Sequence, residues 1–180
     1  MSTDEELILQ VHEGSAEAFA ELFQRYRQPM YGFFVRRLAN PSRAEELAQE
    51  TFMAVLRAAA RYEPRALFRT YLYGIALNLL MADRRKAGRE VSGSAVAGEQ
   101  GSPAKTNNSE EALWVKHAVE QLGPDEREIV LLREYEGLSY GEIAALLRLP
   151  VNTVRSRLFR ARMALRDLLV PQQDREGKQS

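Results

Sequence analysis

Apolar residues recur along this chain at intervals of three and four, and alternation of apolar with polar residues is almost absent. Such spacing gathers apolar side chains on one face of a helix, whereas a half-buried strand needs strict alternation. We therefore predict an all-α protein. Helices are expected at about residues 16–38, 42–60, 67–86, 113–122, 124–136, 140–148 and 152–169.

Several helix ends carry recognisable signals. Ser15 is suited to cap the first helix, and Ser42 with Glu45 has the spacing of a capping box for the second. Pro124 is typical of a first helical position, and Gly137 of a helix stop. The apolar faces predict these core residues in the first two helices: Phe19, Leu22, Phe23, Tyr26, Met30, Leu47, Phe52, Val55, Leu56 and Ala59.

The pattern from Ser139 to Leu169 predicts a helix-turn-helix. Ser139 and Glu142 form a capping box for its first helix. Pro150 should end that helix, because proline disfavours helical geometry in the preceding residue. Asn152 or Thr153 is expected to cap the second helix.

The second helix of this motif separates apolar from basic residues. Its core-facing stripe comprises Val151, Val154, Leu158, Ala161, Leu165 and Leu168. Its other side carries Arg155, Arg157, Arg160, Arg162 and Arg166, with Asn152, Ser156 and Phe159 among them. A solvated basic face is the ordinary explanation of such a helix, but the cap, the tight turn and the basic second helix together favour binding to duplex DNA.

Composition divides the chain into two small helical domains, residues 1–86 and 112–170. Between them, residues 87–111 are predicted to form a flexible linker, since 11 of residues 87–110 are Gly, Ser, Pro or Asn. Residues 171–180 are expected to be a disordered tail.

Charge is uneven although the net charge is +0. Residues 61–90 and 151–170 each carry a net charge of +4, whereas residues 1–13 and 91–126 each carry −4. Two basic regions in a neutral chain indicate two separate contact sites for an anionic partner.

The composition also excludes several classes of function. The chain has no cysteine, which excludes disulfides and thiolate metal sites. We find no signal peptide, no membrane span, no phosphate-binding glycine loop and no metal-binding His spacing, since His12 and His117 are solitary. The expectation is a cytoplasmic protein that is not an enzyme, inserts into no membrane and needs no cofactor.

Two long segments resemble a known family. Residues 42–86, SRAEELAQETFMAVLRAAARYEPRALFRTYLYGIALNLLMADRRK, resemble the second conserved region of bacterial RNA polymerase sigma factors. Residues 122–169, LGPDEREIVLLREYEGLSYGEIAALLRLPVNTVRSRLFRARMALRDLL, resemble their fourth region. The likeness is closest to the extracytoplasmic-function (ECF) group, which has only these two domains and a linker.

The resemblance implies a transcription initiation factor that binds core RNA polymerase, through the β′ coiled coil and the β flap, and directs it to promoters. The implied β′-binding residues are Glu46, Gln49, Glu50, Met53 and Arg57. The residues implied at the melted −10 element are Tyr62, Arg65, Arg69, Tyr71, Asn78, Arg84 and Arg85. Those implied at the duplex −35 element are Thr153, Arg155, Ser156, Phe159 and Arg160. Arg157 is added to this set and is expected at a phosphate or in solvent.

Basic residues interleaved with aromatic rings also suit single-stranded DNA on chemical grounds, because cations follow phosphates and rings stack on unpaired bases. For Phe68, Tyr71 and Tyr73 a role in the core is an equal alternative. The chain departs from the family at Leu56 and Tyr71, where tryptophan is frequent, at Asn152, where glycine is frequent, and at Gly74, where arginine is frequent.

Two other functions compete with the sigma-factor prediction. One is a free-standing helix-turn-helix regulator, and the other is a helical enzyme or adaptor with an incidental basic helix. Members of the ECF group are commonly held inactive by an anti-sigma factor, so such a partner is expected here as well.

Overall fold

The computed structural model describes residues 2–63, 67–93 and 110–170, and every regular element within these ranges is helical. This confirms the predicted all-α class. Contacts divide the chain into two compact units, residues 1–104 and residues 105–180, and their boundary falls inside the segment predicted as a linker. Arg65, most of that linker and the predicted tail at 171–180 lie outside the described residues.

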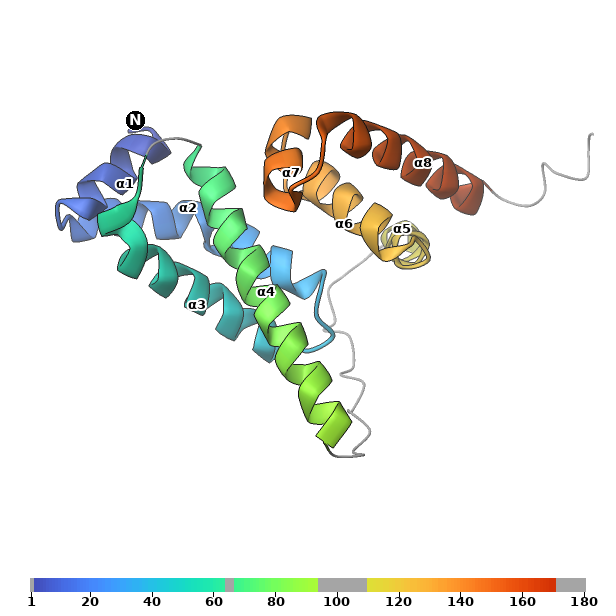
Figure 1. The fold of residues 1–180 in the computed structure, drawn as a ribbon, viewed down its shortest axis with the longest axis horizontal. Helices are drawn as coiled ribbons and strands as arrows, with labels where there is room; N and C mark the ends of the chain where they lie inside the picture. Colours follow the sequence, from blue (N-terminus) through green and yellow to red (C-terminus); the bar gives the residue numbers. More distant parts are fainter. Residues whose placement is uncertain (1, 64–66, 94–109, 171–180) are drawn as a thin grey trace, which may run out of the picture. The chain divides into compact units, whose positions relative to one another are not determined.

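Unit 1 (residues 1–104) contains four α-helices and one short 3-10 turn in its described part (Figure 1). They are α1 (Asp4–His12), α2 (Ala16–Val35), α3 (Pro41–Ala58), η1 (Ala59–Arg61) and α4 (Phe68–Gly93). Helix α2 packs against α1 and α3, and α4 packs against α3 and α1. Figure 1 shows α1 beside the end at which α4 begins.

The core of unit 1 forms where these helices meet. Its largest fully buried side chains are Leu7, Ile8, Leu22, Met30, Phe33, Phe34, Leu47, Phe68, Leu72 and Leu80. Of the predicted core, Phe19, Phe23 and Tyr26 are half-buried. Leu56 is 38% exposed, because it lies at the edge of the stripe formed by Phe52, Val55 and Ala59.

Two helix starts in unit 1 test the predicted caps. The Ser15 hydroxyl accepts a hydrogen bond from Ala18 N at 3.1 Å, which confirms Ser15 as the cap of α2. The predicted capping box of Ser42 and Glu45 is wrong. Asn40 caps α3 instead, with Oδ1 accepting from Ser42 N at 3.0 Å and from Arg43 N at 3.2 Å, so the helix begins at Pro41.

Two features of unit 1 go beyond the sequence prediction. Helix α1 was not predicted, although Thr3 and Glu6 form a complete capping box ahead of buried Leu7 and Ile8. Helix α4 was expected to end at about Lys86 but continues to Gly93. The composition of this stretch had favoured a linker, and its residues 87–89 are exposed.

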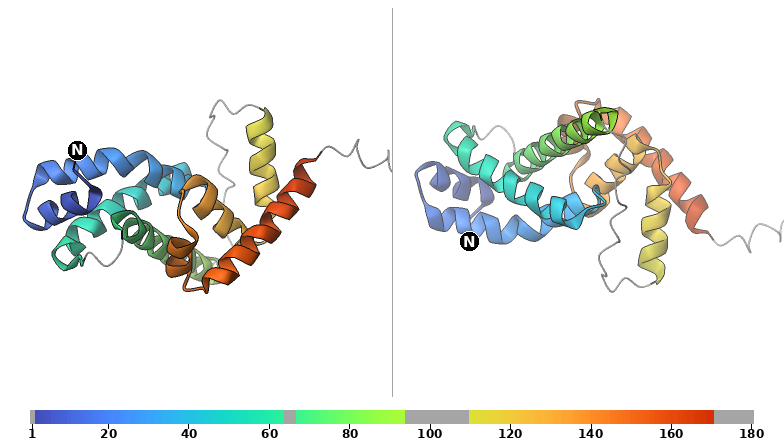
Figure 2. Two further views of the ribbon diagram at one scale, coloured as in Figure 1. Left: turned by 90° about the horizontal axis from the view of Figure 1, so that it is seen from above. Right: turned by 90° about the horizontal axis from the view of Figure 1, so that it is seen from below.

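Unit 2 (residues 105–180) contains α5 (Glu110–Glu120), α6 (Pro124–Val130), the π-helical turn η2 (Leu131–Tyr135), α7 (Tyr140–Leu147) and α8 (Val151–Leu169) in its described part. Helix α8 packs against α5, α6 and α7. In Figure 2, one end of α5 meets α8 and the other projects away, in agreement with the burial of Ala118 and Val119 and the exposure of residues 110–117.

The predicted ends of the helix before the motif are confirmed. Pro124 is at the first turn of α6, and Gly137 has φ +66°, the left-handed conformation that glycine adopts without steric cost. The expected helix from Pro124 to Glu136 finishes as the π-helical turn η2. Leu132 and Leu138, on either side of the glycine, are fully buried and join α7 to the core of unit 2.

Candidate nucleic-acid interface

The helix-turn-helix begins as the sequence predicts. Ser139 N donates to the Glu142 carboxylate at 2.8 Å, and Glu142 N donates to the Ser139 hydroxyl at 3.2 Å, which completes the capping box. Helix α7 ends at Leu147, and its C-cap residue Arg148 has the left-handed φ of 53°. A non-glycine residue rarely adopts this conformation, and no local pattern of residues predicts it here. The turn therefore begins at Arg148, ahead of the Leu149–Pro150 signal.

Helix α8 begins earlier than predicted. Pro150 is at the N-cap position, and its carbonyl accepts from Thr153 N at 2.9 Å and from Val154 N at 3.2 Å. The expectation that Asn152 or Thr153 caps α8 is wrong, because both already lie within its first turn. The ring of Pro150 fixes its φ, so the tight turn leads into α8 although no side chain caps the helix.

The two sides of α8 differ sharply in burial. Val154, Leu158 and Ala161 are buried against the rest of unit 2, whereas Val151, predicted on the same stripe, is 39% exposed at the start of the helix. The opposite side carries exposed Arg155, Ser156, Phe159 and Arg160, with Thr153 half-buried. The Phe159 ring is 64% exposed. An apolar ring among exposed cations and hydroxyls can contact the methyl group of thymine in a major groove.

Acidic residues of unit 2 pair with part of this basic side. Arg157 lies 2.8 Å from Asp125, Arg160 lies 3.8 Å from Glu126, and Arg162 lies 2.7 Å from Glu134. Within the described residues Arg155 has no ion-pair partner. Since Asp125 and Glu126 come from the first turn of α6, the basic charge of α8 is partly balanced before any DNA is bound.

In unit 1, all five residues implied in polymerase binding are exposed on α3. They are Glu46, Gln49, Glu50, Met53 and Arg57. Arg43 lies 2.6 Å from Glu46 and 3.3 Å from Glu50, and also bonds Asp83 of α4 at 2.8 Å. Arg43, which was not among the predicted residues, therefore holds the carboxylates of Glu46 and Glu50.

A cavity of about 330 Å³ lies between α2 and α3, next to this face. It is lined by Phe23, Arg27, Gln28, Tyr31, Glu45, Ala48, Gln49 and Phe52. Gln49 belongs to both the cavity and the exposed face, so the half-buried rings of α2 border the surface implied in polymerase binding. Sequence analysis placed Phe23 and Phe52 in the core, said nothing of Tyr31 and did not predict a cavity.

The aromatic residues of the second basic region have separate roles. Phe68 and Tyr73 are 1% and 3% exposed, which assigns both to the core. Tyr62 and Tyr71 remain half-buried, with ring centroids 5.2 Å apart in an edge-to-face pair. Burial raises the pKa of both phenols, so both stay neutral and hydrogen-bonding at physiological pH.

Helix α4 carries further candidates on the side of Tyr71. Seven-residue steps return to nearly the same face of a helix, so Tyr71, Asn78 and Arg85 share one face. Asn78 and Arg85 are exposed. We call Tyr62, Tyr71, Asn78 and Arg85 the strand line.

The structure does not bring Arg69 and Arg84 to the strand line. Arg69 is half-buried and close enough to Tyr26 for its charge to act on the pKa of that phenol. Arg84 donates to the carbonyl of Arg37, at the end of α2, over 3.5 Å. Arg65 lies outside the described residues.

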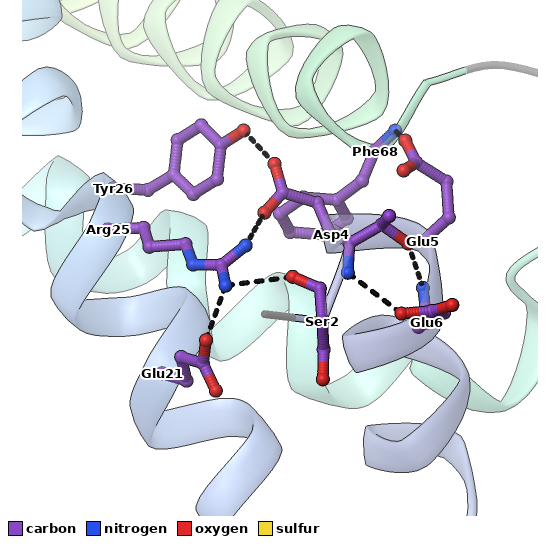
Figure 3. Close-up of polar contacts among 9 residues, drawn as sticks. Ser2, Asp4, Glu5, Glu6, Glu21, Arg25, Tyr26 and Phe68 are labelled. Carbon is purple, nitrogen blue, oxygen red and sulfur yellow. Dashed lines mark hydrogen bonds and ion pairs between the residues drawn. The ribbon is translucent and has the colours of Figure 1, made fainter.

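A polar cluster connects α1 both to α2 and to the start of α4, as Figure 3 shows. The Asp4 carboxylate accepts from Arg25 at 2.6 Å and from the Tyr26 hydroxyl, while Arg25 also bonds Glu21. The Glu5 carboxylate accepts from Phe68 N at 3.0 Å. Sequence analysis noted only the acidic N-terminus and missed the cluster, which depends on contacts between distant parts of the chain.

Neither a membrane-spanning helix nor a metal-binding cluster is found among the described residues. No helix among them is long and apolar enough to span a bilayer. No three or more His, Cys, Asp or Glu residues among them are grouped closely enough to hold a metal ion. His12 and His117 are both exposed.

Comparison with known proteins gives matches over most of the chain. Family models described as sigma-70 region 2 and sigma-70 region 4 match residues 22–90 and 112–165. The chain is 34% identical to the RNA polymerase sigma-H factor of Pseudomonas aeruginosa, over 93% of this chain and 94% of that protein. It is 34% identical to the ECF sigma-E factor of Escherichia coli, over 94% of this chain and 95% of that protein.

Two solved structures are also similar. The sigma factor RpoE of Bartonella quintana, in complex with the anti-sigma factor NepR, has a TM-score of 0.75 and 26% identity, over 86% of this chain and 98% of that one. CnrH, in complex with the cytosolic domain of CnrY, has a TM-score of 0.71 and 26% identity, over 93% of this chain and 97% of that one.

Proposed function

Because this chain belongs to the ECF group of bacterial RNA polymerase sigma factors, we propose that its two units divide promoter recognition between them. As a sigma factor it is a transcription initiation factor that binds core RNA polymerase and directs it to promoters. Helix α8 of unit 2 binds the −35 element as duplex, and the strand line of unit 1 binds the −10 element as melted single strand.

The observation that carries this division is the strand line itself. Two edge-paired phenol rings, an exposed amide and an exposed arginine follow one side of unit 1. A free-standing regulator that binds only duplex DNA has no use for a stacking platform on a second unit. Rings stack on unpaired bases at about 1–3 kcal/mol each, and an amide both donates and accepts along a base edge.

Recognition of the −35 element follows from the exposed side of α8. Its buried side fixes the helix on unit 2, and Arg155, Ser156, Phe159 and Arg160 are exposed on the side that would enter a major groove. An arginine that bonds both acceptors of a guanine contributes about 1–3 kcal/mol of discrimination. Arg157 lies beside Asp125 and is half-buried, so it is better suited to a phosphate than to a base.

Polymerase binding is assigned to the exposed face of α3, which would dock on the β′ coiled coil, with unit 2 docking on the β flap. Support comes from the exposure of all five face residues, among them Met53 at 51%. Arg43 holds Glu46 and Glu50 in place, so both carboxylates reach an incoming partner already oriented. Preorganised charges lose less side-chain entropy on binding.

Three finer assignments complete the proposal. The chain acts in the cytoplasm, it is not itself an enzyme, and an anti-sigma factor controls it. Similarity to the sigma factor RpoE, solved in complex with the anti-sigma factor NepR, supports the last point. Polymerase holds the active site of the reaction, and the chain contributes recognition and strand capture.

The division is tested with two aromatic substitutions, one in each unit, and two DNA probes. We expect Tyr71→Ala to weaken binding of the holoenzyme to a single-stranded −10 oligonucleotide while binding to a −35 duplex stays unchanged. Phe159→Ala should do the reverse. Equal loss on both probes in both variants would contradict the division, and tight −35 binding by the chain without polymerase would favour the free-standing regulator.

A further inference from the structure

Helix α4 begins with a hydrogen bond that comes from a distant part of the chain. Phe68, its first residue, donates its backbone N–H to the Glu5 carboxylate of α1 over 3.0 Å, across 63 residues of sequence (Figure 3). The first N–H groups of a helix have no partner within the helix, and a carboxylate beside them is also favoured by the helix dipole. Glu5 therefore caps the helix that carries the strand line.

The same end of α4 is connected to the strand line by a series of ring contacts. The Phe68 ring lies 5.6 Å from the Tyr26 ring and 6.5 Å from the Tyr71 ring. Tyr71 in turn pairs with Tyr62 at 5.2 Å. A shift of Phe68 therefore changes the separation of the two rings that are to receive a base.

Helix α1 is itself held firmly in place. Leu7 and Ile8 are buried against the rest of unit 1, and Asp4 is bonded to Arg25 and to the Tyr26 hydroxyl. Burial and then this hydrogen bond raise the pKa of Tyr26, so the phenol remains a donor to Asp4 at physiological pH. Glu5 is consequently presented from a fixed support.

We propose that Glu5 is a positioning residue for the −10 strand: by capping α4 at Phe68 it sets Tyr71 against Tyr62 in the geometry that accepts an unpaired base. This inference rests on the proposed function of the strand line. It also agrees with the pKa of Tyr62, which is raised first by burial and next by the nearby Glu5 carboxylate.

The test uses holoenzyme assembled from the full chain and core polymerase. Single-stranded −10 oligonucleotides with the preferred base, or with each other base, are titrated against Glu5→Ala and Glu5→Gln. We expect Glu5→Ala to bind the preferred strand about fivefold more weakly, as expected for the loss of one helix cap, and to discriminate less among bases. Glu5→Gln keeps an acceptor oxygen and should lie between Glu5→Ala and the unchanged protein.

A matched control separates positioning from general stability. Glu13→Gln removes the same charge at the other end of α1, where the side chain is exposed, and should change neither strand binding nor base preference. The affinity of Glu5→Ala for core polymerase should equal that of the unchanged protein. A fall in core affinity, with base preference unaltered, would make Glu5 merely structural and overturn the inference.

Tyr62→Ala distinguishes a failure of the inference from a failure of the proposed function. If Tyr62→Ala weakens strand binding and Glu5→Ala leaves base preference unchanged, the positioning role is wrong and the strand line stands. If Tyr62→Ala has no effect on strand binding, the strand line itself is wrong and the role of Glu5 is lost with it.

Discussion

The two units present their candidate DNA contacts in opposite ways. In unit 1 the rings of Tyr62 and Tyr71 are half-buried and connect through Phe68 to the core. In unit 2 the side chains of Arg155, Phe159 and Arg160 extend from a helix whose other side is packed. The strand-binding surface of unit 1 is thus continuous with its core. The duplex-binding surface of unit 2 consists of exposed side chains that do not contribute to its core.

The contrast follows from the two forms of DNA. Unpaired bases are flexible, so a surface that captures them must be rigid and apolar beforehand, as buried rings are. Duplex DNA already has a regular groove, so exposed side chains on a correctly placed helix are sufficient. Substitutions of the aromatic residues in unit 1 should therefore affect folding and function together, whereas substitutions on the exposed side of α8 in unit 2 should affect function alone.

The largest expected effect is on the stability of unit 1. Phe68→Ala empties a fully buried site and should lower the free energy of unfolding by about 3–5 kcal/mol. The matched change Phe159→Ala, on an exposed ring, should leave it nearly unchanged. Circular dichroism follows both units, whereas fluorescence of Trp114, the only tryptophan of the chain, follows unit 2. If Phe68→Ala also shifted the fluorescence transition, this would contradict the expectation that the two units unfold independently.

The second-largest expected effect is on promoter opening, without a change in the stability of unit 1. Asn78 is exposed, so Asn78→Ala should leave the thermal midpoint unchanged and reduce promoter opening by roughly tenfold through lost base-edge hydrogen bonds. Permanganate reactivity of thymines in the −10 element measures opening. Arg84→Ala, off the strand line, should have the smaller effect. If polymerase binding falls as much as opening in Asn78→Ala, the amide has a structural role.

A smaller and sequence-dependent effect is expected in unit 2. Arg160→Ala should relax the preference at one base pair of the −35 element, by about 1–3 kcal/mol, because a bidentate contact to guanine is lost. Arg166→Ala, farther along α8, should weaken all sequences alike. Competition among −35 duplexes with each base pair changed in turn measures both. A uniform loss for Arg160→Ala would assign Arg160 to a phosphate.

The smallest effect concerns the acids that balance α8. Asp125→Asn releases Arg157 and should raise affinity for any duplex by roughly two- to fivefold, since exposed ion pairs contribute little. The gain should shrink as salt rises. Titration of nonspecific duplex at two salt concentrations measures it. Unaltered affinity at low salt would show that Arg157 does not approach DNA.

Sequence reasoning succeeded where signals are local. The caps at Ser15 and Ser139, the start at Pro124 and the stop at Gly137 depend on neighbouring residues, and the structure confirms all four. The buried and exposed sides of α8 follow from helical spacing in the same way.

Prediction from the sequence failed where a neighbouring residue changes the expected local structure, and where the contacting residue is distant in the sequence. Asn40 replaced Ser42 as the cap of α3 because proline at the first helical position moved the start forward. Arg148 adopts a left-handed conformation imposed by the tight turn. The contact of Glu5 with Phe68 spans 63 residues, so no local pattern could predict it.

The most direct test of the sigma-factor account is transcription by bacterial core RNA polymerase on fragmented genomic DNA from the source organism, with and without this protein. The account predicts new transcripts that begin at discrete sites and share an upstream duplex element and a melted element. No new start sites, together with failure of the protein to co-elute with the core enzyme, would contradict it.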